Sequence, residues 1–114
     1  MSKRDVLLLI DDMLQSAQKI KRYTSGMDYT SFIADAKTVD AVARNFEIIG
    51  EASNRIPSDF KDSHPELEWK RIKGFRNRIV HHYFGIDYEI VWDIIEHYLD
   101  GLIDWLETLI NKYS

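Results

Sequence analysis

Residues 87–111 read DYEIVWDIIEHYLDGLIDWLETLIN, and their apolar side chains recur at intervals of three and four residues. This spacing predicts an amphipathic α-helix, and Asp87 at its start is a residue type that commonly caps a helix. The apolar stripe is broader than a helix with one solvent-facing side needs, so we expect it to be buried on two sides, against a bundle and against a second subunit. The stripe comprises Ile90, Val91, Ile94, Ile95, Tyr98, Leu99, Leu102, Ile103, Leu106, Leu109 and Ile110.

Three further helices precede this stretch in the sequence. Ser2 and Asp5 have the spacing of a capping box at the start of the first, and Thr24, Ser25 and Gly26 break it. Apolar residues at helical spacing place the three helices at about 4–23, 32–55 and 69–82.

The segments between these helices are short. Pro57 ends the second helix, because proline disfavours helix in the residue before it, and Gly85 fits a terminator of the third. Residues 58–67 are polar, with one helical turn expected around Phe60. No alternating run of β-branched residues indicates a strand. The sequence therefore predicts an all-α fold, an antiparallel bundle of about four main helices plus a short helical turn, in a single domain of residues 1–114.

The composition limits the classes of function. The chain has 114 residues, 45% of them apolar, and no cysteine. A packed core is therefore feasible, whereas disulfides, thiolate metal sites and a cysteine nucleophile are excluded. The only apolar run near the N-terminus has five residues and ends before Asp11, which makes it too short for a signal peptide or a membrane span. We expect a cytoplasmic protein with no membrane contact.

The charge is distributed unevenly along the chain. The net charge is −4, yet residues 69–86 contain five cations and no acid, and residues 87–114 contain seven acids and one cation. The local sign of charge matters more than the average for binding phosphate. The basic stripe is compatible with RNA and equally with an ordinary solvated helix face.

The segment RNRIVHHY, residues 76–83, combines a fixed cation, imidazoles and a phenol. Histidine can take the proton of a ribose 2′-hydroxyl near neutral pH, and the guanidinium of Arg76 can stabilise charge on the attacked phosphate. On an ideal helix Arg76 and Tyr83 share a face, but Arg76 and His81 diverge by roughly 140°. They converge only if the arginine wraps round, if the helix unwinds near Gly85, or if two chains pool their motifs. The alternative is that these side chains form a structural network.

Other chemistries have weaker support. The four histidines do not have the spacing of a zinc site, and Asp93 and His97, although one helical turn apart, lack further ligands. No glycine-rich phosphate loop and no Ser-His-Asp set is present, and no helix-turn-helix with a polar recognition helix indicates DNA binding. We expect no metal ion, no cofactor and no DNA.

The stretch RNRIVHHYFGID, residues 76–87, resembles the HepT-like branch of the HEPN superfamily. Its motif is an arginine, usually followed by a polar residue, then four to six residues, a histidine, any residue and a tyrosine. Further points of similarity are IIGEA at 48–52 and the tryptophans before and after the motif. The residues that match are Arg76, Asn77, His81, Tyr83, Gly50, Glu51, Ala52, Trp69 and Trp92.

The resemblance implies a homodimeric, metal-independent RNA endonuclease that acts as the toxin of a type II toxin–antitoxin system. It also implies a cognate minimal nucleotidyltransferase antitoxin, which transfers AMP to the motif tyrosine, Tyr83 here. His82 also fits the looser motif spacing, but only His81 leaves the tyrosine two residues on. The competing interpretation is a non-catalytic helical module that docks a nucleotidyltransferase or a nucleotide.

These considerations assign a role to each candidate residue. Arg76 and His81 are the candidate catalytic residues. Asn77 and Glu51 support them; Glu51 is expected to pair with Arg76 or Arg78, because its small neighbours allow another helix to approach, unless it simply faces solvent. Tyr83 is the candidate site of AMP modification. The candidate RNA contacts are Lys70, Arg71, Lys73, Arg78 and His82.

Overall fold

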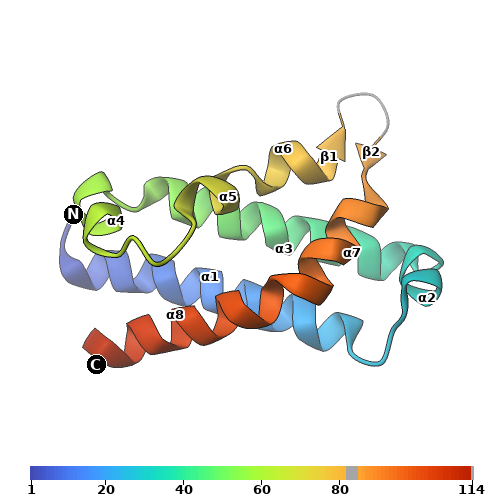
Figure 1. The fold of residues 1–114 in the computed structure, drawn as a ribbon, viewed down its shortest axis with the longest axis horizontal. Coiled ribbons are helices and arrows are strands. Elements are labelled where there is room, and N and C mark those ends of the chain that lie inside the picture. The colour runs from blue at the N-terminus through green and yellow to red at the C-terminus, as the bar shows by residue number, and fades with distance from the viewer. Residues whose placement is uncertain (82–84, 114) are drawn as a thin grey trace.

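The fold is an elongated all-α bundle, as the sequence predicts (Figure 1). The computed structural model describes residues 1–81 and 85–113, and for Arg76, Val80 and His81 it describes the backbone alone. The three long helices are α1 (Lys3–Thr24), α3 (Ala36–Arg55) and α8 (Leu99–Tyr113), and α1 packs against both of the others. The short helix α4 (Ser58–Ser63) is the helical turn expected around Phe60.

The first predicted helix is confirmed together with its cap. The Asp5 backbone N–H donates to Ser2 Oγ at 3.2 Å, and the Ser2 N–H donates to the Asp5 carboxylate at 3.3 Å. This capping box satisfies two backbone donors that no helical carbonyl can reach. The helix ends at Thr24, and Gly26 then adopts a positive φ of 78°, which glycine accommodates without a steric penalty.

The second predicted helix begins four residues later than expected. The Asp35 carboxylate accepts a hydrogen bond from the Thr38 N–H at 3.1 Å and so starts α3 at Ala36. Phe32 instead belongs to the separate short helix α2 (Tyr29–Ile33). Aspartate stabilises a helix start better than a helix interior, so this residue divides an otherwise periodic stretch.

The last predicted helix is divided in two. Asp87 caps α7 (Tyr88–His97) through a 3.1 Å hydrogen bond from the Ile90 N–H, as predicted. The backbone then bends at Tyr98, where φ is −127° and ψ is −34°. The Tyr98 ring lies 5.9 Å from that of Phe75, edge to face. The bend lets α7 pack against the segment that carries the motif while α8 packs against α1 (Figure 1).

The third predicted helix differs most from expectation. It forms α5 (Trp69–Lys73) and α6 (Phe75–Ile79), and the chain continues as β1 (Val80–His81), which pairs antiparallel with β2 (Gly85–Ile86). The predictions of helix through residue 82 and of no strand are therefore wrong at this point. The Ile79 carbonyl accepts from the Asp87 N–H at 2.6 Å, and Gly85, expected to terminate a helix, lies in β2 with φ 75°. Glycine adopts a positive φ without a steric penalty, because it has no Cβ atom.

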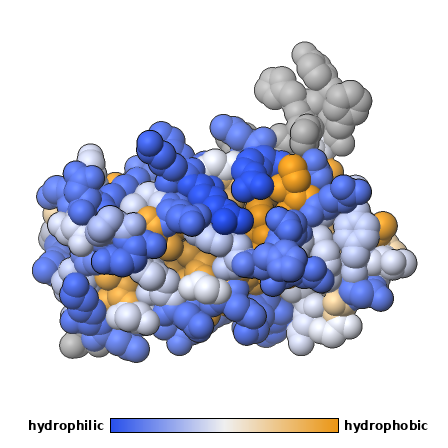
Figure 2. All heavy atoms as spheres, in the orientation of Figure 1, coloured by the Kyte–Doolittle hydropathy of each residue, from blue (hydrophilic) through white to orange (hydrophobic). Residues whose placement is uncertain are grey.

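The broad apolar stripe of residues 87–111 is accounted for within one chain. Its residues are buried or partly buried, for example Val91, Ile94 and Leu106 at 0% exposure. The face drawn in Figure 2 is mostly hydrophilic, with apolar groups in a band between the polar ones. The stripe therefore does not by itself require a second subunit, and the homodimer stays a prediction.

Candidate active site

The motif begins on α6 and continues into the short β-ladder at one end of the bundle (Figure 1). Arg76 lies on α6 and His81 in β1, where it pairs with Gly85. His82 and Tyr83 lie outside the described residues. Because α6 ends at Ile79, Arg76 and His81 do not share a helix. The roughly 140° divergence expected on a continuous helix therefore does not apply, and the convergence of the two side chains stays a prediction.

A hollow of about 400 Å³ lies beside the motif, between α3 and the α5–α6 segment. Asn77, exposed on α6, lines it opposite Glu51, exposed on α3. The structure thus brings together four of the predicted site residues from two parts of the sequence. The lining residues are Glu47, Gly50, Glu51, Asn54, Lys70, Lys73, Gly74 and Asn77.

Gly50 lies where the two walls of this hollow come close to each other. A Cβ atom at Gly50 would lie 3.5 Å from the Ile72 carbonyl oxygen, which is van der Waals contact with the backbone of α5. The neighbouring Ala52 is buried. The expectation that the small residues around Glu51 allow another helix to approach closely is therefore confirmed.

Glu51 is exposed, which fits the solvent-facing alternative, and its nearest cation lies on its own helix. Its carboxylate lies 3.8 Å from Arg44 Nη1 on the same helix, and Arg44 also reaches Glu47 at 3.4 Å. Within the part of the chain that the structure describes, Glu51 forms no ion pair with Arg78. Its pairing with Arg76 stays a prediction, because the Arg76 side chain is not among those described.

The predicted RNA contacts fall into two groups. Lys70, Lys73 and Arg78 are exposed, and the two lysines line the hollow. Arg71 is only partly exposed: its guanidinium carbon lies 4.1 Å from the centroid of the Tyr98 ring, and Nη1 lies 3.4 Å from Glu68. Burial and the nearby Glu68 raise the pKa of Tyr98, against the opposing effect of Arg71. Arg71 thus joins α5 to the α7–α8 bend, a structural role that competes with its predicted contact to RNA.

The histidines outside the motif have other surroundings. His64 is buried at 4% exposure; its Nδ1 donates to the Phe60 carbonyl at 2.9 Å, and its Nε2 lies 2.8 Å from the Tyr113 hydroxyl. A carbonyl can only accept, so Nδ1 carries a proton. His97 is exposed and lies 3.8 Å from Asp93. Among the described residues, no three acidic or histidine side chains are placed to hold a metal ion.

Lys61 is a further cation close to the basic segment of residues 69–86, and the sequence analysis did not include it. Lys61 lies on α4, eight residues before Trp69, among acidic and polar neighbours. The fold places it close enough to Lys73 for the two charges to repel.

In the described part of the chain, no helix is both long enough and apolar enough to cross a membrane.

Comparison with known proteins finds a ribonuclease family model and relatives whose names are those of ribonucleases. A family model described as "Ribonuclease HepT-like" matches residues 13–109. A Methanocaldococcus jannaschii protein provisionally named as an RNase is 39% identical over 111 residues, which cover 97% of this chain and 92% of that protein. A second from that organism, also provisionally named as an RNase, is 45% identical over 96 residues, 84% and 88% of the two chains. A Thermococcus cleftensis protein provisionally named ribonuclease HepT is 36% identical over 100 residues, 88% and 91%. No solved structure matches.

Proposed function

Because the chain belongs to the HepT-like ribonuclease family, we propose that it is a metal-independent RNA endonuclease whose chemistry is carried by Arg76 and His81. The observation that carries this proposal is the end of α6 at Ile79, between the two residues. It removes the helical constraint that would keep them apart. The adjoining hollow, lined by Asn77, Lys70 and Lys73, supplies cations and an amide next to the motif.

In the proposed reaction the ribose 2′-oxygen attacks its own 3′-phosphorus. His81 accepts the proton of the 2′-hydroxyl as the new O–P bond forms. The bond to the 5′-oxygen of the next nucleotide breaks, and that oxygen takes a proton from water and leaves as a hydroxyl. Arg76 stabilises the negative charge that develops on the phosphate, and Asn77 orients one of the two groups. Lys70, Lys73, Arg78 and His82 hold neighbouring phosphates.

The test is cleavage of an end-labelled RNA in the presence of EDTA. We expect products that end in a 2′,3′-cyclic phosphate and a 5′-hydroxyl, and no cleavage of the same sequence as DNA, which lacks the 2′-hydroxyl. Loss of activity in EDTA, or cleavage of the DNA at a similar rate, would contradict the mechanism. Absence of cleavage together with tight binding to a nucleotidyltransferase would favour the non-catalytic module instead.

We further propose that the enzyme is a type II toxin controlled by its cognate minimal nucleotidyltransferase. Transfer of AMP from ATP would form a bond between the Tyr83 oxygen and the α-phosphorus and release pyrophosphate. The attached phosphodiester is negatively charged and rich in hydrogen-bond acceptors, so it would compete with RNA phosphate for Arg76. Its nucleotide would also occupy space next to the motif.

Intact-mass measurement after co-expression with the nucleotidyltransferase tests this control. We expect an increase of one AMP on the wild-type chain and on Tyr88→Phe, the matched control, because Tyr88 is an exposed tyrosine five residues away. The increase should vanish in Tyr83→Phe. Its persistence in that variant would place the modification on another residue and refute the assignment.

A further inference from the structure

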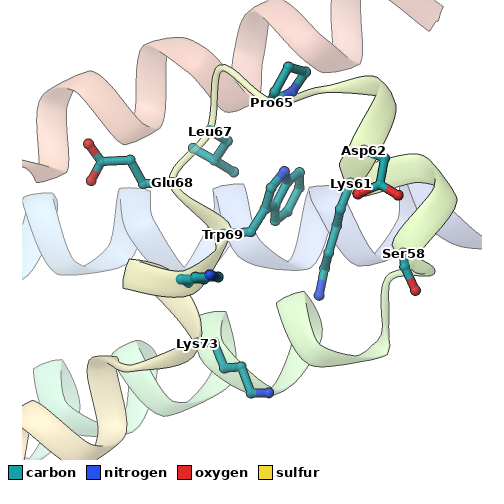
Figure 3. A pocket seen from close by; sticks show the side chains of 9 residues that line it. Ser58, Lys61, Asp62, Pro65, Leu67, Glu68, Trp69 and Lys73 are labelled. Atoms are coloured by element: carbon teal, nitrogen blue, oxygen red, sulfur yellow. The ribbon is translucent and has the colours of Figure 1, made fainter.

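A second hollow, of about 550 Å³, lies between α4, the loop that follows it and α5 (Figure 3). The Lys61 side chain from α4 extends alongside the indole of Trp69, and Lys73 approaches from α5 (Figure 3). This volume is within the range of pockets that hold small organic ligands. The hollow combines an aromatic ring with three lysines, Lys61, Lys70 and Lys73.

Trp69 is held in a fixed position. Its indole N–H donates to the His64 carbonyl at 2.9 Å, and its ring meets Trp105 edge to face, with centroids 5.9 Å apart and planes at 90°. Lys61 Nζ lies 5.8 Å from the centroid of the indole. The indole is partly exposed. A rigid, partly exposed ring next to cations is the arrangement on which proteins stack nucleic-acid bases.

Within the part of the chain that the structure describes, none of the three lysines forms an ion pair with a carboxylate. Burial, and secondarily repulsion from Lys73, lower the pKa of Lys61. Two carboxylates, Asp62 and Glu68, also line the hollow. Glu68 is paired with Arg71 at 3.4 Å, so the charge of Asp62 alone remains to balance the three lysines. A phosphate bound here would relieve the repulsion between lysines.

This hollow shares two of its lysines with the hollow beside the motif. Lys70 and Lys73 line both, and the other hollow contains Asn77. Lys70 and Asn77 are seven positions apart in the sequence, on α5 and α6, and both line the hollow beside the motif. One RNA strand could therefore pass from the motif across the two lysines and reach Trp69.

We propose that the hollow of Lys61, Trp69, Lys70 and Lys73 is a subsite for single-stranded RNA, which binds a base and a phosphate a few nucleotides from the bond that is cleaved. The base stacks on Trp69, and its phosphate lies between Lys61 and Lys73. This inference rests on the proposed ribonuclease function. It predicts that the enzyme prefers substrates long enough to span both hollows.

Binding of a ten-nucleotide 2′-O-methyl RNA tests the subsite without any cleavage, because the methylated 2′-oxygen cannot attack. We expect Trp69→Leu to weaken binding at least about fivefold, the low end of the loss for one stacked base. Lys61→Gln should weaken it measurably and reduce its dependence on salt. Lys19→Gln is the matched control, since Lys19 is an exposed lysine on α1 that lines neither hollow. Equal binding by Lys61→Gln and Lys19→Gln would overturn the proposal, even if Trp69→Leu fails to fold.

Substrate length and free nucleotide distinguish an RNA subsite from a general loss of activity and from a mononucleotide site. On a long RNA, Lys61→Gln should raise KM with little change in kcat, whereas on a dinucleotide it should behave as wild type. An equal loss on both substrates would overturn the proposal. Free AMP should compete weakly with the ten-nucleotide RNA; displacement by AMP at the affinity of the RNA would overturn the proposal in favour of a mononucleotide site. If no RNA is cleaved by any variant, the proposed function fails, and the binding comparison still decides the subsite.

Discussion

Arg71 and Arg78 carry the same charge on the same basic segment but lie in different surroundings. Arg71 stacks on Tyr98 and pairs with Glu68, whereas Arg78 is exposed. The sequence suggests the same role for both, because the ring that contacts Arg71 comes from Tyr98, on a distant part of the chain. The ribonuclease family was predictable from residues 76–83, whereas the different surroundings of Arg71 and Arg78 depend on tertiary contacts.

Substitution of the two arginines should separate stability from RNA binding. We expect Arg71→Gln to lower the free energy of unfolding by about 1 kcal/mol, because it removes a partly desolvated cation–π contact. Arg78→Gln should change stability by less than about 0.5 kcal/mol, as is usual for an exposed side chain, and should weaken RNA binding. Urea unfolding and RNA titration of both variants provide the measurement. The opposite pattern, with Arg78→Gln the more destabilising, would show that these roles are reversed.

At the scale of elements, helical periodicity predicted the helical regions but not where they break. The capping box at Ser2, the end of the second helix before Pro57 and the cap at Asp87 are all visible in local sequence and are confirmed. The break at Asp35 involves a residue that also occurs inside helices. The end of α6 at Ile79 depends on pairing with residues 85–86 and a hydrogen bond from Asp87. Such pairing leaves no periodic signal in the sequence.

The close approach of α3 and α5 at Gly50 can be tested by side-chain size. Gly50→Ala should be within about 1 kcal/mol of wild type, since its Cβ would be in ordinary contact with the Ile72 carbonyl and alanine favours a helix. Gly50→Leu should lower the free energy of unfolding by about 1–3 kcal/mol, because the larger side chain must displace α5. Thermal and urea unfolding report both values. Equal stability of the leucine and alanine variants would mean that the two helices are not in close contact here.

For the whole molecule, the homodimer remains a prediction that rests on the family resemblance. The apolar stripe of residues 87–111 is buried or partly buried within one chain, so it does not require a second subunit. We expect light scattering at micromolar concentration to give twice the 13.5 kDa chain mass. A monomeric mass under these conditions would count against a cleft shared by two motifs.

The central claim, that the Arg76–His81 motif cleaves RNA, is tested most directly by comparing two histidine variants in EDTA. His97 is the matched control, because it is exposed on α7 and its neighbours Asp93 and Glu96 are also on the surface. We predict that His81→Ala lowers kcat/KM by at least about 100-fold, as expected for a lost proton-transfer group, and that His97→Ala cleaves RNA at the wild-type rate. Undiminished cleavage by His81→Ala would contradict the account.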